Sequence, residues 1–163
     1  MSFFTATDGT RLFYRDWGSE RPVVFCHAWP QSSDAWEHQM LFLWSKGFRV
    51  VAHDRRGHGH SGGSERGNDI NTYADDLAAL LEALDLREAV LVGHAIGASE
   101  VVRYLSRHGS SRIRGIALLA PAIPRITRSP DYPRALPSRT FDELASRLRL
   151  DRDRSFQALA ATY

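Results

Sequence analysis

The chain has one cysteine among its 163 residues, no long apolar run and almost no net charge. The lone Cys26 excludes an intrachain disulfide framework, and its place in the apolar run 23–26 favours a buried thiol. No stretch approaches the roughly 18 apolar residues of a membrane span, and residues 1–5 do not resemble a signal peptide. A formal net charge of +2 offers no broad attraction for nucleic acid or an anionic membrane. We therefore expect a cytoplasmic protein that binds neither nucleic acid nor membrane.

What is present is the composition of an ordinary globular domain, with 43% hydrophobic and 25% charged residues. Asp8-Gly9 between two strand-like segments predicts an N-terminal antiparallel hairpin. Apolar runs predict strands, and apolar residues at helical spacing predict helices. The expected strands are 3–7, 11–17, 22–26, 48–52, 89–92 and 113–119, and the expected helices are 33–46, 71–86 and 96–107. This alternation predicts an α/β fold with a mostly parallel sheet flanked by helices.

Some helix ends carry sequence signals of their own. Ser33 or Asp34 is expected to cap the helix 33–46, because short polar side chains bond free N–H groups at helix starts. Five prolines within residues 121–137 predict an extended excursion. Beyond it, the pattern Thr140-x-x-Glu predicts a capping box and a helix to residue 150. A last helix is expected over 151–163.

Residues 90–98 read Val-Leu-Val-Gly-His-Ala-Ile-Gly-Ala, an expected strand, sharp turn and helix start. This is the setting of the nucleophile elbow, Gly-x-Ser-x-Gly, where small residues permit a tight turn. The central residue here is Ala95 rather than serine. Taken alone, the match is weak.

Two further segments strengthen it. Phe25-Cys26-His27-Ala28-Trp29-Pro30 resembles a His-Gly-x-Pro oxyanion loop, and residues 54–61 resemble an Asp-x-Arg-Gly-x-Gly-x-Ser loop. With segments 73–77 and 100–104 in order and spacing, the chain resembles the esterase/non-haem haloperoxidase (perhydrolase) branch of the α/β-hydrolase superfamily. The resemblance implies an α/β-hydrolase fold. Residues 1–120 would form the N-terminal part of its core, and residues 121–163 would begin a helical cap.

The resemblance also implies an acyl-transfer site. A serine at position 95 would attack an ester carbonyl, and the backbone N–H groups of Trp29 and Ile96 would stabilise the oxyanion. Trp29 and Ile123 would contact the substrate, a small-molecule ester or carboxylic acid. No metal or other cofactor is expected. In the family the acid and histidine lie beyond residue 163, so a C-terminal remainder of the same fold is expected as partner.

Three alanines depart from the family pattern. Ala95 has no nucleophilic atom, a loss that costs on the order of 10⁶-fold in turnover in a serine hydrolase. Ala28 and Ala98 stand where glycines are usual, and Ala28 would disturb the oxyanion loop only if its φ were positive. The leading hypothesis is a carboxylesterase, with perhydrolase or haloperoxidase side activity, inactive as given because of Ala95. The alternative is a non-catalytic binding protein of this fold, a pseudoenzyme.

Several histidines lie near these motifs. His94 precedes the nucleophile position, but packing or hydrogen bonding is the preferred interpretation because the family base comes from elsewhere. A structural hydrogen bond is preferred for His27. The His53-Asp54 pair and the His58-x-His60 spacing suggest metal ligands, yet they fall in a loop whose aspartate and arginine brace a turn.

Overall fold

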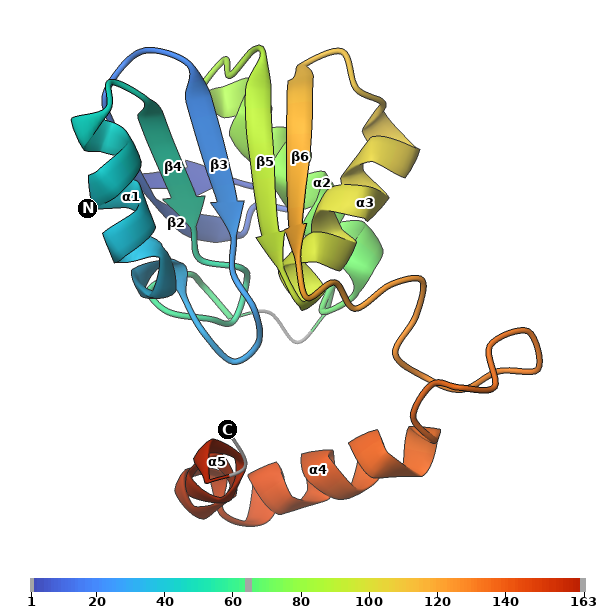
Figure 1. The fold of residues 1–163 in the computed structure, drawn as a ribbon. Helices are drawn as coiled ribbons and strands as arrows, with labels where there is room; N and C mark the ends of the chain where they lie inside the picture. Colours follow the sequence, from blue (N-terminus) through green and yellow to red (C-terminus); the bar gives the residue numbers. More distant parts are fainter. Residues whose placement is uncertain (1, 64–65, 162–163) are drawn as a thin grey trace. The chain divides into compact units, whose positions relative to one another are not determined.

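The computed structural model describes residues 2–63 and 66–161, and its contacts divide the chain into units 1–122 and 123–163 (Figure 1). The strands are β1 (Ser2–Thr5), β2 (Arg11–Trp17), β3 (Pro22–Cys26), β4 (Arg49–His53), β5 (Ala89–His94) and β6 (Ile113–Leu119). The helices are η1 (Ser33–Trp36), α1 (Glu37–Ser45), α2 (Ile70–Ala83), α3 (Ile96–His108), α4 (Ser138–Leu150) and α5 (Arg152–Ala160). The last two residues of the helix expected over 151–163 lie outside the described residues.

The strands form one sheet in the order β1-β2-β4-β3-β5-β6. β1 and β2 form the expected antiparallel hairpin, and β2 pairs antiparallel with β4. The remaining pairs, β4 with β3, β3 with β5 and β5 with β6, are parallel. The predicted class, a mostly parallel sheet flanked by helices, is confirmed.

Helices cover the two faces of this sheet unequally (Figure 1). On one face α2 and α3 bury a stripe of leucines, Val101 and Tyr104 against β3, β4 and β5. On the other face η1 and α1 place Trp36 and Met40 over β3 and β4. β6 forms an edge of the sheet. The carboxyl ends of β3, β4 and β5 meet at one rim, where ligands of open α/β sheets bind.

The unit 123–163 contains the two helices α4 and α5, preceded by an irregular segment with two isolated β-bridges. The proline-rich segment forms no helix, but it is not the extended excursion that was predicted. It turns back on itself, with Arg128 N donating to Leu136 O at 2.8 Å and Ser129 bridged to Tyr132, because proline also favours turns. Neither helix has a buried residue among those described. No helix in the described part of the chain is long and apolar enough to cross a membrane.

The first helical segment begins at Ser33, as predicted, but its capping residue differs from the prediction. Ser32, not Ser33 or Asp34, is the cap, and its Oγ accepts a hydrogen bond from Asp34 N. Ser32 has the extended backbone of a cap residue, whereas the Asp34 carboxylate pairs with Arg15 on β2. The side chain of Asp34, which the sequence pattern predicted as a possible cap, is therefore engaged by an arginine that is distant in sequence.

The predicted capping box at Thr140 is wrong. α4 begins at Ser138, and the flanking Pro137 makes no side-chain cap bond. Thr140 N donates to the carbonyl oxygen of Pro137, so Thr140 already lies in the first turn. The cap therefore lies at Pro137, three residues before the predicted one.

Candidate active site

Ala95 forms a strained turn between β5 and α3. Its backbone adopts φ +50° and ψ −112°, a sparsely populated positive-φ conformation that costs a non-glycine residue roughly 1–3 kcal/mol. Ala95 N donates to Leu119 O at 3.0 Å, and Ala95 O accepts from Ala98 N at 3.1 Å and Ala122 N at 3.3 Å. The surrounding chain thus holds a sharp strand-to-helix turn of the kind that presents a nucleophile above an α/β sheet.

Glycines around the turn make close backbone packing possible. A Cβ at Gly93 would lie 2.5 Å from Gly97 O and 2.6 Å from Ala98 Cα. A Cβ at Gly97 would lie 2.2 Å from Cys26 O and 2.8 Å from His27 O. The first turn of α3, which begins at Ile96, therefore lies directly against the end of β3. Ala98 is itself fully buried, so an alanine is accommodated at that position.

The loop after β3 carries the other expected oxyanion donor, Trp29. The Trp29 side chain is 40% exposed, while Ala28 is buried. Ala28 is not among the residues with positive φ, so an alanine there strains no backbone. Ile123, the other expected substrate contact, belongs to the unit 123–163, and its role stays a prediction.

A buried polar network ties this loop to α3. Arg55 Nε and Nη2 donate to Glu100 Oε2 at 3.0 and 2.8 Å, and Arg55 Nη2 also donates to His27 O at 2.6 Å. Burial alone would raise the pKa of Glu100, but the charges of Arg55 and His53 outweigh it and lower the pKa to about 2. Sequence analysis missed this pair, because Arg55 and Glu100 are 45 residues apart.

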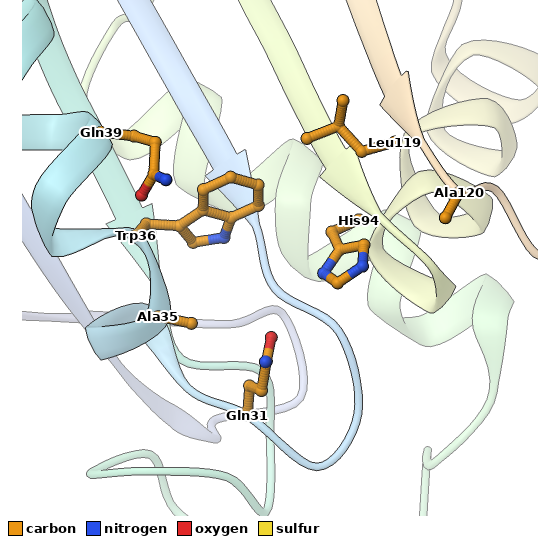
Figure 2. A pocket seen from close by; sticks show the side chains of 7 residues that line it. All are labelled: Gln31, Ala35, Trp36, Gln39, His94, Leu119 and Ala120. Carbon is orange, nitrogen blue, oxygen red and sulfur yellow. The ribbon is translucent and has the colours of Figure 1, made fainter. Parts of the chain in front are cut away.

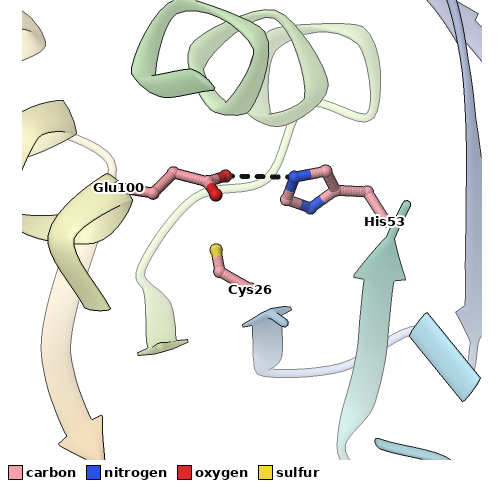
Figure 3. A group of neighbouring side chains, drawn as sticks. All are labelled: Cys26, His53 and Glu100. Atoms are coloured by element: carbon pink, nitrogen blue, oxygen red, sulfur yellow. Dashed lines mark ion pairs between the residues drawn. The ribbon is translucent and has the colours of Figure 1, made fainter. Parts of the chain in front are cut away.

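Cys26, His53 and Glu100 also meet in this buried region, with their polar atoms within 4.8 Å of one another (Figure 3). His53 Nε2 lies 3.0 Å from Glu100 Oε1, within ion-pair distance but outside hydrogen-bonding geometry. These atoms do not suit a metal ion. Burial raises the pKa of the Cys26 thiol well above its usual value, and Arg55 already neutralises Glu100.

Asp54 braces the loop that follows β4. Its Oδ1 accepts from Ser33 N and its Oδ2 accepts from His60 N, both at 2.7 Å. A Cβ at Gly59 would lie 2.0 Å from Asp54 Oδ2, so the loop closes tightly around this carboxylate. Asp54 therefore braces this turn, as predicted for the aspartate of the motif. His58 Nδ1 lies 3.0 Å from the backbone oxygen of Arg56.

A pocket of about 290 Å³ opens beside the turn (Figure 2). His94 lies beside the indole of Trp36, with ring centroids 6.4 Å apart in an edge-to-face arrangement. That contact agrees with the packing role expected for His94. Sequence analysis did not single out the other lining residues, which carry no motif. The lining residues are Gln31, Ala35, Trp36, Gln39, His94, Leu119 and Ala120.

A strained strand-to-helix turn at the carboxyl rim of a mostly parallel sheet defines the architecture of the α/β hydrolases. The sequence profile of the alpha/beta hydrolase fold matches residues 21–159, and the chain belongs to this family. It is 45% identical over 161 residues to a non-heme haloperoxidase of Rhodococcus erythropolis, covering 99% of this chain and 59% of the relative. It is 42% identical over 163 residues to a bifunctional esterase/perhydrolase of Acinetobacter calcoaceticus, covering 99% of this chain and 59% of the relative.

Solved structures agree with this assignment. An esterase from Exiguobacterium antarcticum superposes with a TM-score of 0.93 at 31% identity, over 97% of this chain and 59% of the esterase. A bromoperoxidase from Bacillus anthracis superposes with a TM-score of 0.85 at 35% identity, over 93% of this chain and 56% of the bromoperoxidase. The chain thus spans between half and two thirds of the length of these relatives.

Proposed function

We propose that the chain carries the nucleophile-elbow part of a carboxylic-ester hydrolase site, with Ala95 at the nucleophile position. The observation that carries the proposal is the positive-φ backbone of Ala95 at the turn from β5 to α3. The backbone N–H groups of Trp29 and Ile96 are the oxyanion donors in this proposal. Both are main-chain groups, so replacement of a serine side chain by alanine leaves them in place.

The proposed ligand is a small ester or its carboxylic acid, which Trp29 and Ile123 contact. Relatives described as an esterase/perhydrolase and as a haloperoxidase support acyl transfer, including transfer to peroxide, as the chemistry of this branch. With alanine at position 95 no acyl-enzyme can form, and turnover falls on the order of 10⁶-fold. The chain with Ala95 is therefore proposed to bind but not to hydrolyse.

The acid and the histidine of the site are proposed to come from a C-terminal segment packed beside β6. β6 is an edge strand, and its side chains Ile116 and Leu119 are 43% and 46% exposed. An apolar edge of a parallel sheet is normally covered. The relatives, of whose length this chain matches 59%, have further residues for such a segment.

Restoring the serine tests the proposal. Residues 1–163 are joined to the C-terminal part of the Rhodococcus relative, and Ala95→Ser is compared with the parent and with Ala95→Gly. We expect p-nitrophenyl acetate hydrolysis to rise at least about 10³-fold in Ala95→Ser only, within the range that a nucleophile contributes. Circular dichroism checks that all three chimeras fold.

A second candidate function is the non-catalytic binding protein. It is favoured by three departures at one site, since Ala28, Ala95 and Ala98 all stand where the family usually has glycine or serine. A folded Ala95→Ser chimera that binds acetate but hydrolyses nothing would favour this function and contradict the hydrolase.

A further inference from the structure

His27 lies fully buried beneath the loop that carries Trp29. Three contacts fix its position. His27 Nε2 lies 3.0 Å from the backbone N of Arg55, His27 Nδ1 lies 2.8 Å from Ala28 O, and His27 O accepts from Arg55 Nη2. The ring therefore bridges the loops that follow β3 and β4.

These contacts determine the protonation of the ring. A backbone N–H can only donate, so the Nε2 that faces Arg55 N must be the unprotonated acceptor. The proton of the neutral ring then lies on Nδ1, which donates to Ala28 O. Burial and the nearby charge of Arg55 lower the pKa of His27 to about 3, so the neutral form persists at ordinary pH.

The carbonyl of Ala28 and the N–H of Trp29 belong to one planar peptide unit. A bond that fixes the direction of the carbonyl oxygen therefore fixes the opposite direction of the Trp29 N–H. Gln31 N also donates to Ala28 O at 2.9 Å, so the oxygen is held from the loop and from the buried side. We propose that His27 is a positioning residue that aims the Trp29 N–H into the oxyanion site.

The buried network of His27 and Arg55 also extends to α3, whose first residue, Ile96, supplies the second proposed donor. Arg55 bonds both His27 and Glu100, and Glu100 lies on α3, the helix that begins at Ile96. One chain of buried hydrogen bonds thus connects the loop that carries Trp29 to the helix that begins at Ile96. Oxyanion stabilisation depends on donors fixed in advance of the reaction, so such a connection serves the proposed acyl transfer directly.

The ring itself is tested on the unchanged chain. We expect a long-range ¹H–¹⁵N spectrum to show His27 as the Nδ1–H form, with no titration between about pH 5 and about pH 8. An Nε2–H ring, or a ring that titrates in this interval, would overturn the proposal.

Two variants separate positioning from folding. His27→Asn keeps a donor near the place of Nδ1, whereas His27→Leu removes it. His60→Leu is the matched control, because His60 lies on the loop after β4 and is partly exposed. We expect the Trp29 amide signal to move in His27→Leu, to stay near its parent position in His27→Asn, and to be unaffected in His60→Leu.

Acetate serves as the probe of the oxyanion site. Its dissociation constant, followed through the Trp29 and Ile96 amides, should rise on the order of tenfold in His27→Leu, less than the loss of a whole donor. In His27→Asn we expect the dissociation constant of acetate to return toward its parent value. If His27→Leu lowers only the melting temperature and leaves the amide signal and acetate binding unchanged, the positioning role is wrong.

The positioning role of His27 rests on the proposed function, and different results would contradict the two proposals. If acetate binds nowhere near Trp29 even in the parent, the proposed oxyanion site is wrong. The tautomer of His27 and the response of the Trp29 amide would still decide whether His27 orients this peptide.

Discussion

Gly97 packs so closely against β3 that a Cβ on it would lie 2.2 Å from the carbonyl oxygen of Cys26. In a free helix, Gly97→Ala would stabilise the chain by about 1 kcal/mol. Here the clash is with backbone atoms, so strand and helix would have to separate. We expect a loss of about 3 kcal/mol in unfolding free energy, measured by urea denaturation.

Gly115→Ala on β6 is the matched control for this prediction. No heavy atom lies within 4 Å of a Cβ at Gly115, and its φ is not positive. The change should stay within about 0.5 kcal/mol of the parent. Equal stability of the two variants would contradict the close approach at Gly97.

Neighbouring aspartates on α2 provide a comparison between a buried and an exposed ion pair. Arg56 Nε and Nη2 each donate to Asp76 at 2.7 Å, and Arg56 is 1% exposed. Arg107 makes the same two-bond contact with Asp75, but its side chain is 35% exposed. Only the first pair leaves an uncompensated buried carboxylate when its arginine is removed.

We therefore expect Arg56→Met to lower the unfolding free energy by about 3–5 kcal/mol. Arg107→Met should lower it far less, because water solvates Asp75 and His108 Nε2 lies 2.7 Å from it. Urea denaturation of both variants measures the difference. Similar losses in the two would show that burial does not govern these pairs.

Ala95 carries a backbone conformation suited to glycine. Ala95→Gly should relieve the positive-φ strain and raise the unfolding free energy by about 1 kcal/mol, although the more flexible unfolded chain offsets part of it. Thermal unfolding measures the change. Ala98→Gly, in the buried part of α3, is the control and should destabilise the chain by about 1 kcal/mol. Destabilisation by Ala95→Gly would mean that the turn is unstrained.

The sheet could be predicted from sequence largely because its signals are local. Pro22–Cys26 and Ile113–Leu119 match the expected strands residue for residue, since short apolar runs mark the strands of a parallel sheet. The turn at Ala95 was also predictable, because strand, turn and helix start fall within nine residues. The caps at Ser32 and Pro137 were not predicted, because the Asp34 side chain pairs with Arg15 on β2 and α4 begins before the Thr140 pattern.

The polar network beneath the site could not be predicted. His27 and Arg55 are 28 residues apart, and Arg55 and Glu100 are 45 apart. Nothing in the spacing of the three residues says that they share one buried space. Only the order of the strands, which places β3 between β4 and β5, brings them together.

His27 also predicts how stability depends on pH. The pKa of His27 is about 3 in the folded chain against 6.5 for an unperturbed histidine. Between these values the unfolded chain binds a proton that the folded chain does not, so stability falls as the pH is lowered. For one such group the slope approaches about 1.4 kcal/mol per pH unit below pH 6.5. Carboxylates protonate mostly below about pH 5, so the interval from about pH 5 to about pH 6.5 excludes most of their contribution.

We expect the unfolding free energy, measured in urea across this interval, to fall with decreasing pH in the parent and in His60→Asn. His27→Asn should be less stable at neutral pH, because Arg55 N loses its acceptor. It should also lose most of the pH slope, since asparagine does not titrate. If His27→Asn has the same pH slope as the parent, the pH dependence of the unfolding free energy comes from other histidines. The same result would also show that the folded chain does not hold His27 in the neutral form that fixes the peptide of Trp29.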